Sequence, residues 1–103
     1  MPQLKSLAEK VEQVSQIYAE RHEITRDDDW FLLKLQEEVG ELTQAYLRFT
    51  GRSKLGPVEA DDHRAELEDE VADVVCHALL LAKRCGLGVD AAIERKWLTH
   101  LSS

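Results

Sequence analysis

Apolar residues recur at steps of three and four along most of the chain, which is the spacing that places side chains on one face of an α-helix. In the first such segment, Gln3–His22, the apolar stripe runs from Leu4 to Tyr18 and is heptad-like. No segment alternates between apolar and polar residues with a period of two, so the pattern predicts no β-strand. We therefore expect an all-α chain.

Three further helices are expected, separated by segments that break the stripe. The second covers Trp30–Phe49 and the third covers Asp61–Cys85. Gly51 and Gly86 follow these two stripes, at the positions where helices commonly end. The last helix is short and carries Trp97.

Short polar residues mark two of the helix starts. Thr25 or one of Asp27–Asp29 can accept a backbone hydrogen bond at the start of the second helix, and Asp90 can do so for the last. The length of 103 residues predicts one domain, 1–103, with only a modest core of its own. We expect a four-helix chain forming a helical bundle that is completed by oligomerisation, as a homodimer or homotetramer.

Composition narrows the range of partners and locations. The net charge is −7, from 20 acidic against 13 basic residues, which argues against nucleic acid or an anionic membrane surface as a partner. The longest unbroken apolar run, Ala78–Ala82, is too short to cross a membrane. Cys76 and Cys85 fall on opposite sides of one predicted helix, and no signal peptide is visible, so we expect free thiols and a cytoplasmic location.

Acidic residues gather on both central helices. Glu37, Glu38 and Glu41 span an arc of about 100° on the second helix, beside its apolar stripe, although like charges at this spacing repel. Glu70 and Asp73 lie one turn apart on the third helix. If the two helices pack antiparallel, these two groups of carboxylates face each other.

The segment around Asp73 sharpens this hypothesis. Apart from Asp73 and His77, residues Val71–Ala82 are apolar, so we expect the segment to be largely buried. An unpaired buried carboxylate is costly and tends to take up a proton. Asp73 therefore needs a partner, which is His77, an arginine from elsewhere in the chain, or a metal ion shared with the glutamates.

Four carboxylates without a thiol or an imidazole suit a hard cation, Mg²⁺, with Mn²⁺ as a possible substitute. A di-iron site is not expected, because it needs Glu-x-x-His pairs that the sequence lacks. An exposed, solvated acidic surface remains the alternative to a metal site.

The same residues match a known pattern. Glu37, Glu38 and Glu41, followed by Glu70 and Asp73, resemble the E-E-x-x-E … E-x-x-D signature of the MazG-like, all-α nucleoside triphosphate pyrophosphohydrolases. The stretches "KLQEEVGEL" and "LEDEVADVV" look like that family's two metal-binding helices, and "GLGVDAAIERKW" looks like its final turn and helix. The resemblance covers most of the chain.

The resemblance implies hydrolysis of a nucleoside triphosphate between its α and β phosphates, giving a nucleoside monophosphate and pyrophosphate, in a housecleaning role. It also implies a set of Mg²⁺ ligands, which are Glu38, Glu41, Glu70 and Asp73. Glu37 would orient or deprotonate the attacking water. Mg²⁺ would reconcile the anionic substrate with an acidic protein.

Four other residues are candidates for substrate binding, each with a plainer interpretation. The functional interpretation of Lys34 is that it contacts a phosphate; the plainer one is that it forms an ion pair with Glu38, one helical turn later. Arg52, in the loop after the second helix, closes over a triphosphate or is solvated. Lys96 lies where family members place a basic residue that contacts phosphates, and Trp30 stacks on a base or belongs to the core.

Two alternatives to this enzyme stay open. The chain is also similar, more distantly, to phosphoribosyl-ATP pyrophosphohydrolase, which shares the fold. The other alternative is a non-catalytic helical interaction module, in which the glutamates form a solvated or regulatory surface.

Overall fold

The computed structural model describes residues 2–52 and 60–101, and helices account for most of these ranges. The elements are α1 (Pro2–Arg21), α2 (Asp28–Phe49), α3 (Ala60–Arg84), α4 (Val89–Lys96) and a short 3₁₀ helix, η1 (Leu98–Leu101). The prediction of an all-α chain with four main helices is confirmed, and the described ranges contain no strand. None of these helices is both long and apolar enough to cross a membrane.

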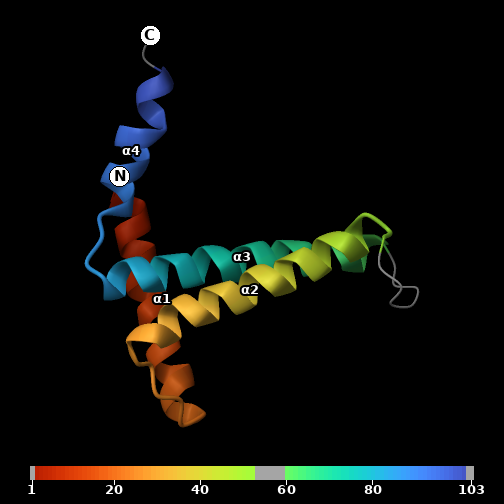
Figure 1. Ribbon diagram of the computed structural model, residues 1–103, viewed down its shortest axis with the longest axis horizontal. Helices are drawn as coiled ribbons and strands as arrows, with labels where there is room; N and C mark the ends of the chain where they lie inside the picture. Colours follow the sequence, from red (N-terminus) through yellow and green to blue (C-terminus); the bar gives the residue numbers. More distant parts are fainter. Residues whose placement is uncertain (1, 53–59, 102–103) are drawn as a thin grey trace.

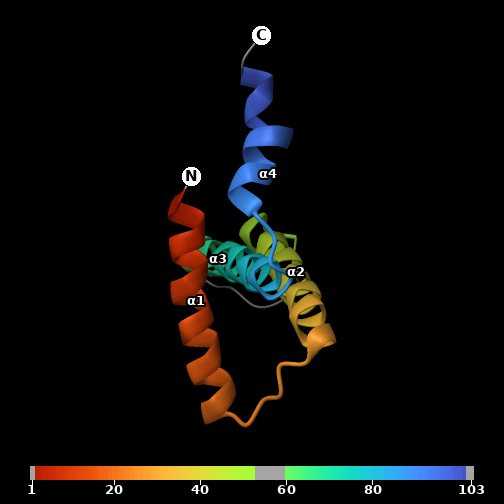
Figure 2. The same cartoon turned by 90° about the vertical axis from the view of Figure 1, so that its left-hand side faces the viewer.

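Two long helices form the centre of the molecule. α2 and α3 lie side by side as an antiparallel hairpin, and α1 crosses this hairpin near the end where α2 begins and α3 finishes (Figure 1). α4 and η1 continue beyond α3 and extend away from the hairpin (Figures 1 and 2). The antiparallel pairing places the acidic residues of α2 opposite those of α3, which is the arrangement expected from the sequence.

The fold is open, because only the hairpin is packed along its length. The radius of gyration is 16.3 Å, against about 13 Å for a compact chain of this size. The buried apolar residues among those described are Ala19, Phe31, Ala45, Leu79, Leu80 and Ala82. This small core leaves much apolar surface exposed to water.

The first half of the segment Val71–Ala82 is less buried than its sequence predicts. Val71 and Val75 are each 45% exposed, and Asp73 is exposed as well. The prediction of a largely buried segment is therefore wrong for this half, and full burial begins only at Leu79. The physical reason is that α2 covers one side of α3 while α1 crosses only its last turns, so the remaining sides have no partner among the described residues.

The ends of the two hairpin helices follow the sequence signals. The Asp27 carboxylate caps α2 by accepting a hydrogen bond from the backbone N–H of Trp30 at 2.9 Å, so one of the predicted caps is confirmed. Gly51 follows α2 at φ 74°, and Gly86 follows α3 at φ 67°. Both are left-handed conformations that glycine adopts without strain.

The predicted cap of the last helix is wrong. α4 begins at Val89, and its N-cap position is Gly88, which offers no side-chain hydrogen bond. Asp90 lies inside the first turn instead, where its negative charge still interacts favourably with the helix dipole.

A cluster of charged and aromatic side chains, here called the clasp, fastens α1 to the hairpin. Its members are Glu12, Arg26, Asp28, Phe31 and Arg84. Arg26 donates to both carboxylate oxygens of Glu12, at 2.8 and 2.9 Å, and its guanidinium carbon lies 5.2 Å from the centre of the Phe31 ring. Arg84 lies 5.4 Å from the same ring and pairs with Asp28. These hydrogen bonds from Arg26 lower the pKa of Glu12 below its ordinary value.

Candidate functional site

Three carboxylates converge between α2 and α3, and we call them the acidic triad. Glu38 and Glu41 on α2 and Glu70 on α3 each place one oxygen within 4.8 Å of the other two. Glu38 and Glu41 lie one turn apart on the same side of α2, and the antiparallel pairing brings Glu70 opposite them. The structure thus brings together three of the four predicted metal ligands.

Glu38 is the buried member of the triad. Only 7% of this residue is exposed, and its Oε2 atom has no hydrogen-bond partner within the described part of the chain. Burial, reinforced by the neighbouring Glu41 and by the charge of Asp73, raises the pKa of Glu38 to about 7. The charge of Lys34, whose Nζ lies 4.0 Å from Glu38 Oε1, acts in the opposite sense. The strongly buried acid is therefore Glu38, and not Asp73 as the sequence predicts.

Glu70, the member of the triad on α3, also lies close to other carboxylates. Burial, followed by the charges of Glu41 and Asp73, raises the pKa of Glu70, and its Oε2 atom is also buried without a described hydrogen-bond partner. Asp73 follows one turn later on α3 and lies beside the triad rather than within it. Arg48, whose charge also reaches Glu70, is already hydrogen-bonded to Glu66 at 3.1 Å.

Glu37, the predicted general base, lies outside the triad on an exposed side of α2. Its Oε1 atom is 3.4 Å from Lys34 Nζ. Together with Trp30, these two residues line an open hollow at the start of α2. Glu37 is therefore accessible to water and to a ligand, and it directly precedes the buried Glu38 on α2.

A pocket of about 560 Å³ opens beside Glu38 and Asp73. α1 supplies one wall of it, made of Lys10, Val11, Val14, Ser15 and Tyr18. α2 and α3 supply the rest, which includes Trp30, Lys34, Cys76, His77 and Leu80. The pocket therefore joins a largely apolar, aromatic wall to Glu38, the buried member of the acidic triad. The part that α1 plays here is not readable from the sequence, because an apolar stripe indicates packing and gives no sign of a pocket.

His77 lies between the triad and the aromatic part of the pocket. Its Nε2 atom is 3.9 Å from Glu38 Oε1, and its ring centre is 6.2 Å from that of Trp30. Burial, followed by the charge of Lys34, lowers the pKa of His77. The imidazole is thus neutral near pH 7 and does not balance the charge of the carboxylates.

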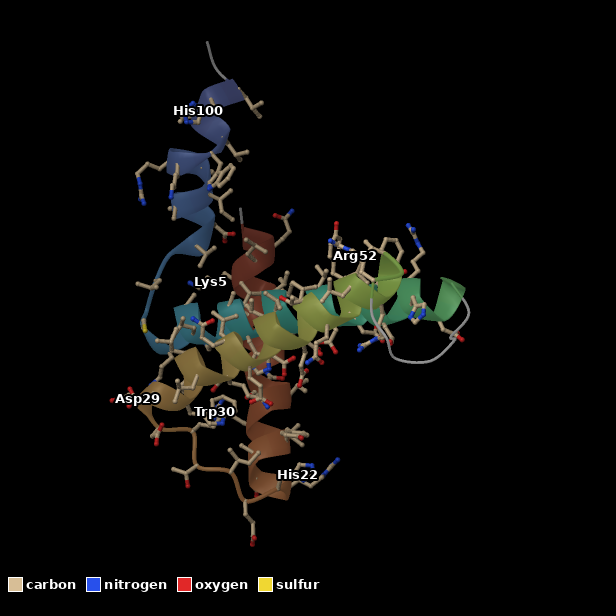
Figure 3. The ribbon with its side chains drawn as sticks, turned by 45° about the vertical axis from the view of Figure 1, so that its right-hand side comes forward. Lys5, His22, Asp29, Trp30, Arg52 and His100 are labelled. Atoms are coloured by element: carbon tan, nitrogen blue, oxygen red, sulfur yellow. The ribbon has the colours of Figure 1, made fainter. Side chains whose placement is uncertain are left out.

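The four predicted substrate-binding residues separate into two groups. Trp30 and Lys34 line the pocket. Arg52 lies at the opposite end of the hairpin from Trp30 (Figure 3), where its guanidinium carbon is 5.4 Å from the centre of the Tyr46 ring. Lys96 lies on α4, which packs on α1 and extends away from the hairpin (Figure 1). The structure therefore does not bring Arg52 or Lys96 to the triad of the same chain.

The donor set of the triad fits a hard divalent cation. All three donors are carboxylate oxygens, which Mg²⁺ prefers, and the charge of Asp73, outside the triad, also acts on Glu38. Buried oxygens without a donor, as in Glu38 and Glu70, need either protons or a cation to satisfy them. Lys34 is too far from Glu38, at 4.0 Å, to supply a full hydrogen bond.

No protein-family model matches the chain, and no curated protein matches it either. The resemblance to the MazG-like pyrophosphohydrolases therefore stays a prediction from motifs. The support for a function comes from the arrangement of the carboxylates and from the pocket beside them.

Proposed function

We propose that this protein is a Mg²⁺-dependent nucleotide pyrophosphohydrolase, which cleaves a nucleoside triphosphate between its α and β phosphates. The observation that carries the proposal is the convergence of Glu38, Glu41 and Glu70 at the edge of a pocket with an aromatic wall. A nucleotide has two parts of matching chemistry, because its triphosphate needs cations and its base needs a flat apolar surface.

The acidic triad and Asp73 would hold the metal. Bound Mg²⁺ would neutralise charge on the phosphate oxygens and lower the pKa of a coordinated water. The closeness of the carboxylates favours a metal site over an acidic surface that is simply solvated. Burial and the acidic neighbours of Glu38 raise its pKa to about 7. A carboxylate that served only solubility would have no reason to be buried.

Glu37 would act on the attacking water. Its carboxylate is exposed beside the pocket and is held by Lys34 at 3.4 Å. In the reaction, the water oxygen bonds to a phosphorus atom of the α–β linkage, the bridging P–O bond breaks, and pyrophosphate and a nucleoside monophosphate separate. Glu37 takes the proton that the water loses.

The pocket wall would position the rest of the nucleotide. Trp30 and Tyr18 offer aromatic surfaces to a base, while Lys34 and Lys10 offer positive charge to phosphates. Lys96 could join a site only by reaching another copy of the chain, since α4 extends away from its own hairpin.

We also propose a homodimer or homotetramer, located in the cytoplasm. Exposed apolar side chains lie on α2 and α3, among them Leu32, Val39, Tyr46, Val71 and Val75. Their helical spacing places them together on the side of the hairpin that faces away from the acidic residues. A second copy of the hairpin would cover this side and complete a bundle.

The decisive experiment measures pyrophosphate release from a panel of nucleoside triphosphates and phosphoribosyl-ATP, with and without Mg²⁺. We expect Mg²⁺-dependent release that falls by about 10²-fold or more in Glu38→Gln, because a charged ligand is lost. Glu68→Gln is the matched control, since Glu68 is an exposed acid on α3 outside the triad.

Two results of this assay would contradict the proposal. Release from phosphoribosyl-ATP alone would replace the proposed substrate, a nucleoside triphosphate, with phosphoribosyl-ATP. No release from any substrate, or equal release from Glu38→Gln, would reject the enzyme and leave the helical interaction module.

A further inference from the structure

A second cavity, here called the junction cavity, lies where α1, α3 and α4 meet. Its volume is about 370 Å³, which is within the usual range for pockets that hold small molecules. Its apolar floor is made of Leu4, Ala8, Leu79, Ala82, Leu87 and Val89. It shares no lining residue with the pocket beside Glu38, so the two are separate sites.

Two lysines line the junction cavity beside this floor. Lys5 comes from α1, where that helix crosses α3 (Figure 3), and Lys83 comes from the last turn of α3. Neither lysine forms an ion pair with any described residue. The charge of Lys83 acts on Glu12, but Glu12 is already bound by Arg26. Two positive charges without a partner therefore face one cavity.

The third charged residue of the junction cavity is Asp90, in the first turn of α4. Asp90 does not cap its helix, and its Oδ1 atom is buried without a hydrogen-bond partner among the described residues. A buried carboxylate oxygen needs a donor, and a charged donor makes the stronger bond. Neither Lys5 nor Lys83 supplies it in this fold, although both line the same cavity.

We propose that the junction cavity binds a free α-amino acid with an apolar side chain. The ammonium group of the ligand donates to Asp90, and its carboxylate accepts from Lys5 and Lys83. The apolar side chain lies on the floor, against the buried Leu79. Each part of the ligand thus meets a part of the cavity that has no other partner within the described chain.

The set of charges favours a zwitterion over simpler ligands. An apolar acid would leave Asp90 without a donor, and an apolar amine would leave both lysines without an acceptor. A free phosphate would offer nothing to the apolar floor and would place its negative charge near Asp90. An α-amino acid carries both charges on one carbon atom and leaves its side chain for the floor.

A ligand in the junction cavity would connect three helices, because Lys5, Lys83 and Asp90 belong to α1, α3 and α4. Binding to the folded state alone raises the melting temperature. No residue of the acidic triad lines the cavity, so binding needs neither Mg²⁺ nor the proposed hydrolytic activity.

The first test is calorimetric titration of the full-length protein in EDTA, at about pH 6.5, where the amino groups of the probes are protonated. The probes are leucine, isoleucine, valine, methionine and phenylalanine as free L-amino acids. We expect at least one to bind at a single site with a Kd below about 10 mM and to raise the melting temperature.

Two analogues of leucine show which groups are recognised. L-leucinamide lacks the carboxylate, and isocaproate lacks the ammonium group. We expect each to bind at least about 10-fold more weakly than L-leucine, because each leaves one charged part of the cavity without its partner. This comparison uses the wild type alone and does not depend on the folding of any variant.

The second test changes the cavity instead of the ligand. In Asp90→Asn, isocaproate should bind within about twofold of L-leucine, and in the double variant Lys5→Gln, Lys83→Gln, L-leucinamide should do so. Lys96→Gln is the matched control, because Lys96 is an exposed lysine of α4 outside the cavity, and it should keep the wild-type preference. A misfolded variant would bind no ligand, so an exchanged preference cannot come from misfolding.

Two results would overturn the proposal. One is the absence of binding by all five amino acids, and the other is equal binding of L-leucine and either analogue by the wild type. Neither result bears on the enzyme, which the pyrophosphate assay tests. Binding of an amino acid without pyrophosphate release would keep the junction site and reject only the hydrolase.

Discussion

The clasp and the acidic triad are two groups of charged side chains in one small protein, and they are organised in opposite ways. In the clasp every charge has a partner of opposite sign, as in the bidentate pair of Arg26 with Glu12. In the triad, Glu38 and Glu41 repel each other and both face Glu70. The first arrangement is complete without any ligand, whereas in the second the buried oxygens of Glu38 and Glu70 have no hydrogen-bond partner among the described residues. The clasp therefore serves the fold, whereas the triad is the part of the molecule for which we propose a role in binding.

The largest expected change in stability comes from removing Phe31, the ring at the centre of the clasp. Phe31→Ala removes a buried ring that two guanidinium groups approach, so we expect the free energy of unfolding to fall by about 3–5 kcal/mol. Chemical denaturation measures this change. Leu33→Ala, at an exposed position on the same helix, should change it by no more than about 0.5 kcal/mol. Equal losses from the two variants would show that the clasp does not hold the fold.

The next prediction concerns the ion pair between Arg26 and Glu12. Arg26→Met leaves the largely buried Glu12 without its charged partner and with only the hydrogen bond from Gln16, so we expect a loss of about 1–3 kcal/mol in the free energy of unfolding. Adding Glu12→Gln should recover part of this loss, because the orphaned charge is then removed. A double variant that is less stable than the single one would contradict the bidentate pair as the main contact.

The same kind of change in the triad should have the opposite sign. In metal-free buffer, Glu38→Gln removes a buried charge beside Glu41, so we expect stabilisation by about 1–2 kcal/mol. Thermal melts in EDTA measure it. Mg²⁺ should then raise the melting temperature of the wild type more than that of the variant. Destabilisation of the variant in EDTA would mean that the triad is not electrostatically crowded.

The smallest expected effect is a pH dependence of the clasp. The pKa of Glu12 is lowered by Arg26, so its ionised form stabilises the folded state. This contribution is fully present above the unfolded pKa of about 4.5 and is lost as the pH falls through the lower, folded value. We expect the stability difference between the wild type and Glu12→Gln, about 1 kcal/mol at neutral pH, to shrink below pH 4.5. A difference that stays constant down to pH 3 would contradict the shift.

The local features of this fold are readable from the sequence, whereas the burial of single residues is not. Periodicity predicts the helices, and helix geometry predicts that Glu38, Glu41 and Glu70 converge once α2 and α3 pack antiparallel. Asp73 shows the limit of this reasoning, because its apolar neighbours indicate burial while the chain leaves its side of α3 uncovered. Whether a face is covered depends on where another helix crosses, and no local pattern carries that information.

The clasp illustrates the same limit. Arg26 and Arg84 lie 58 positions apart in the sequence, and both meet at Phe31. Neither arginine stands at helical spacing from the ring, so no motif connects them. The contribution of α1 to the pocket was missed for the same reason, because it arises from the crossing of α1 over the hairpin.

The crossing of α1 over the hairpin divides the pocket between two separate pieces of structure. Val11, Val14 and Tyr18 belong to a helix that carries none of the carboxylates of the triad. Substitutions on that helix can reshape what the pocket admits while every carboxylate stays in place. In the enzyme that we propose, recognition and chemistry would therefore change independently, and a search for altered ligand preference would begin on α1.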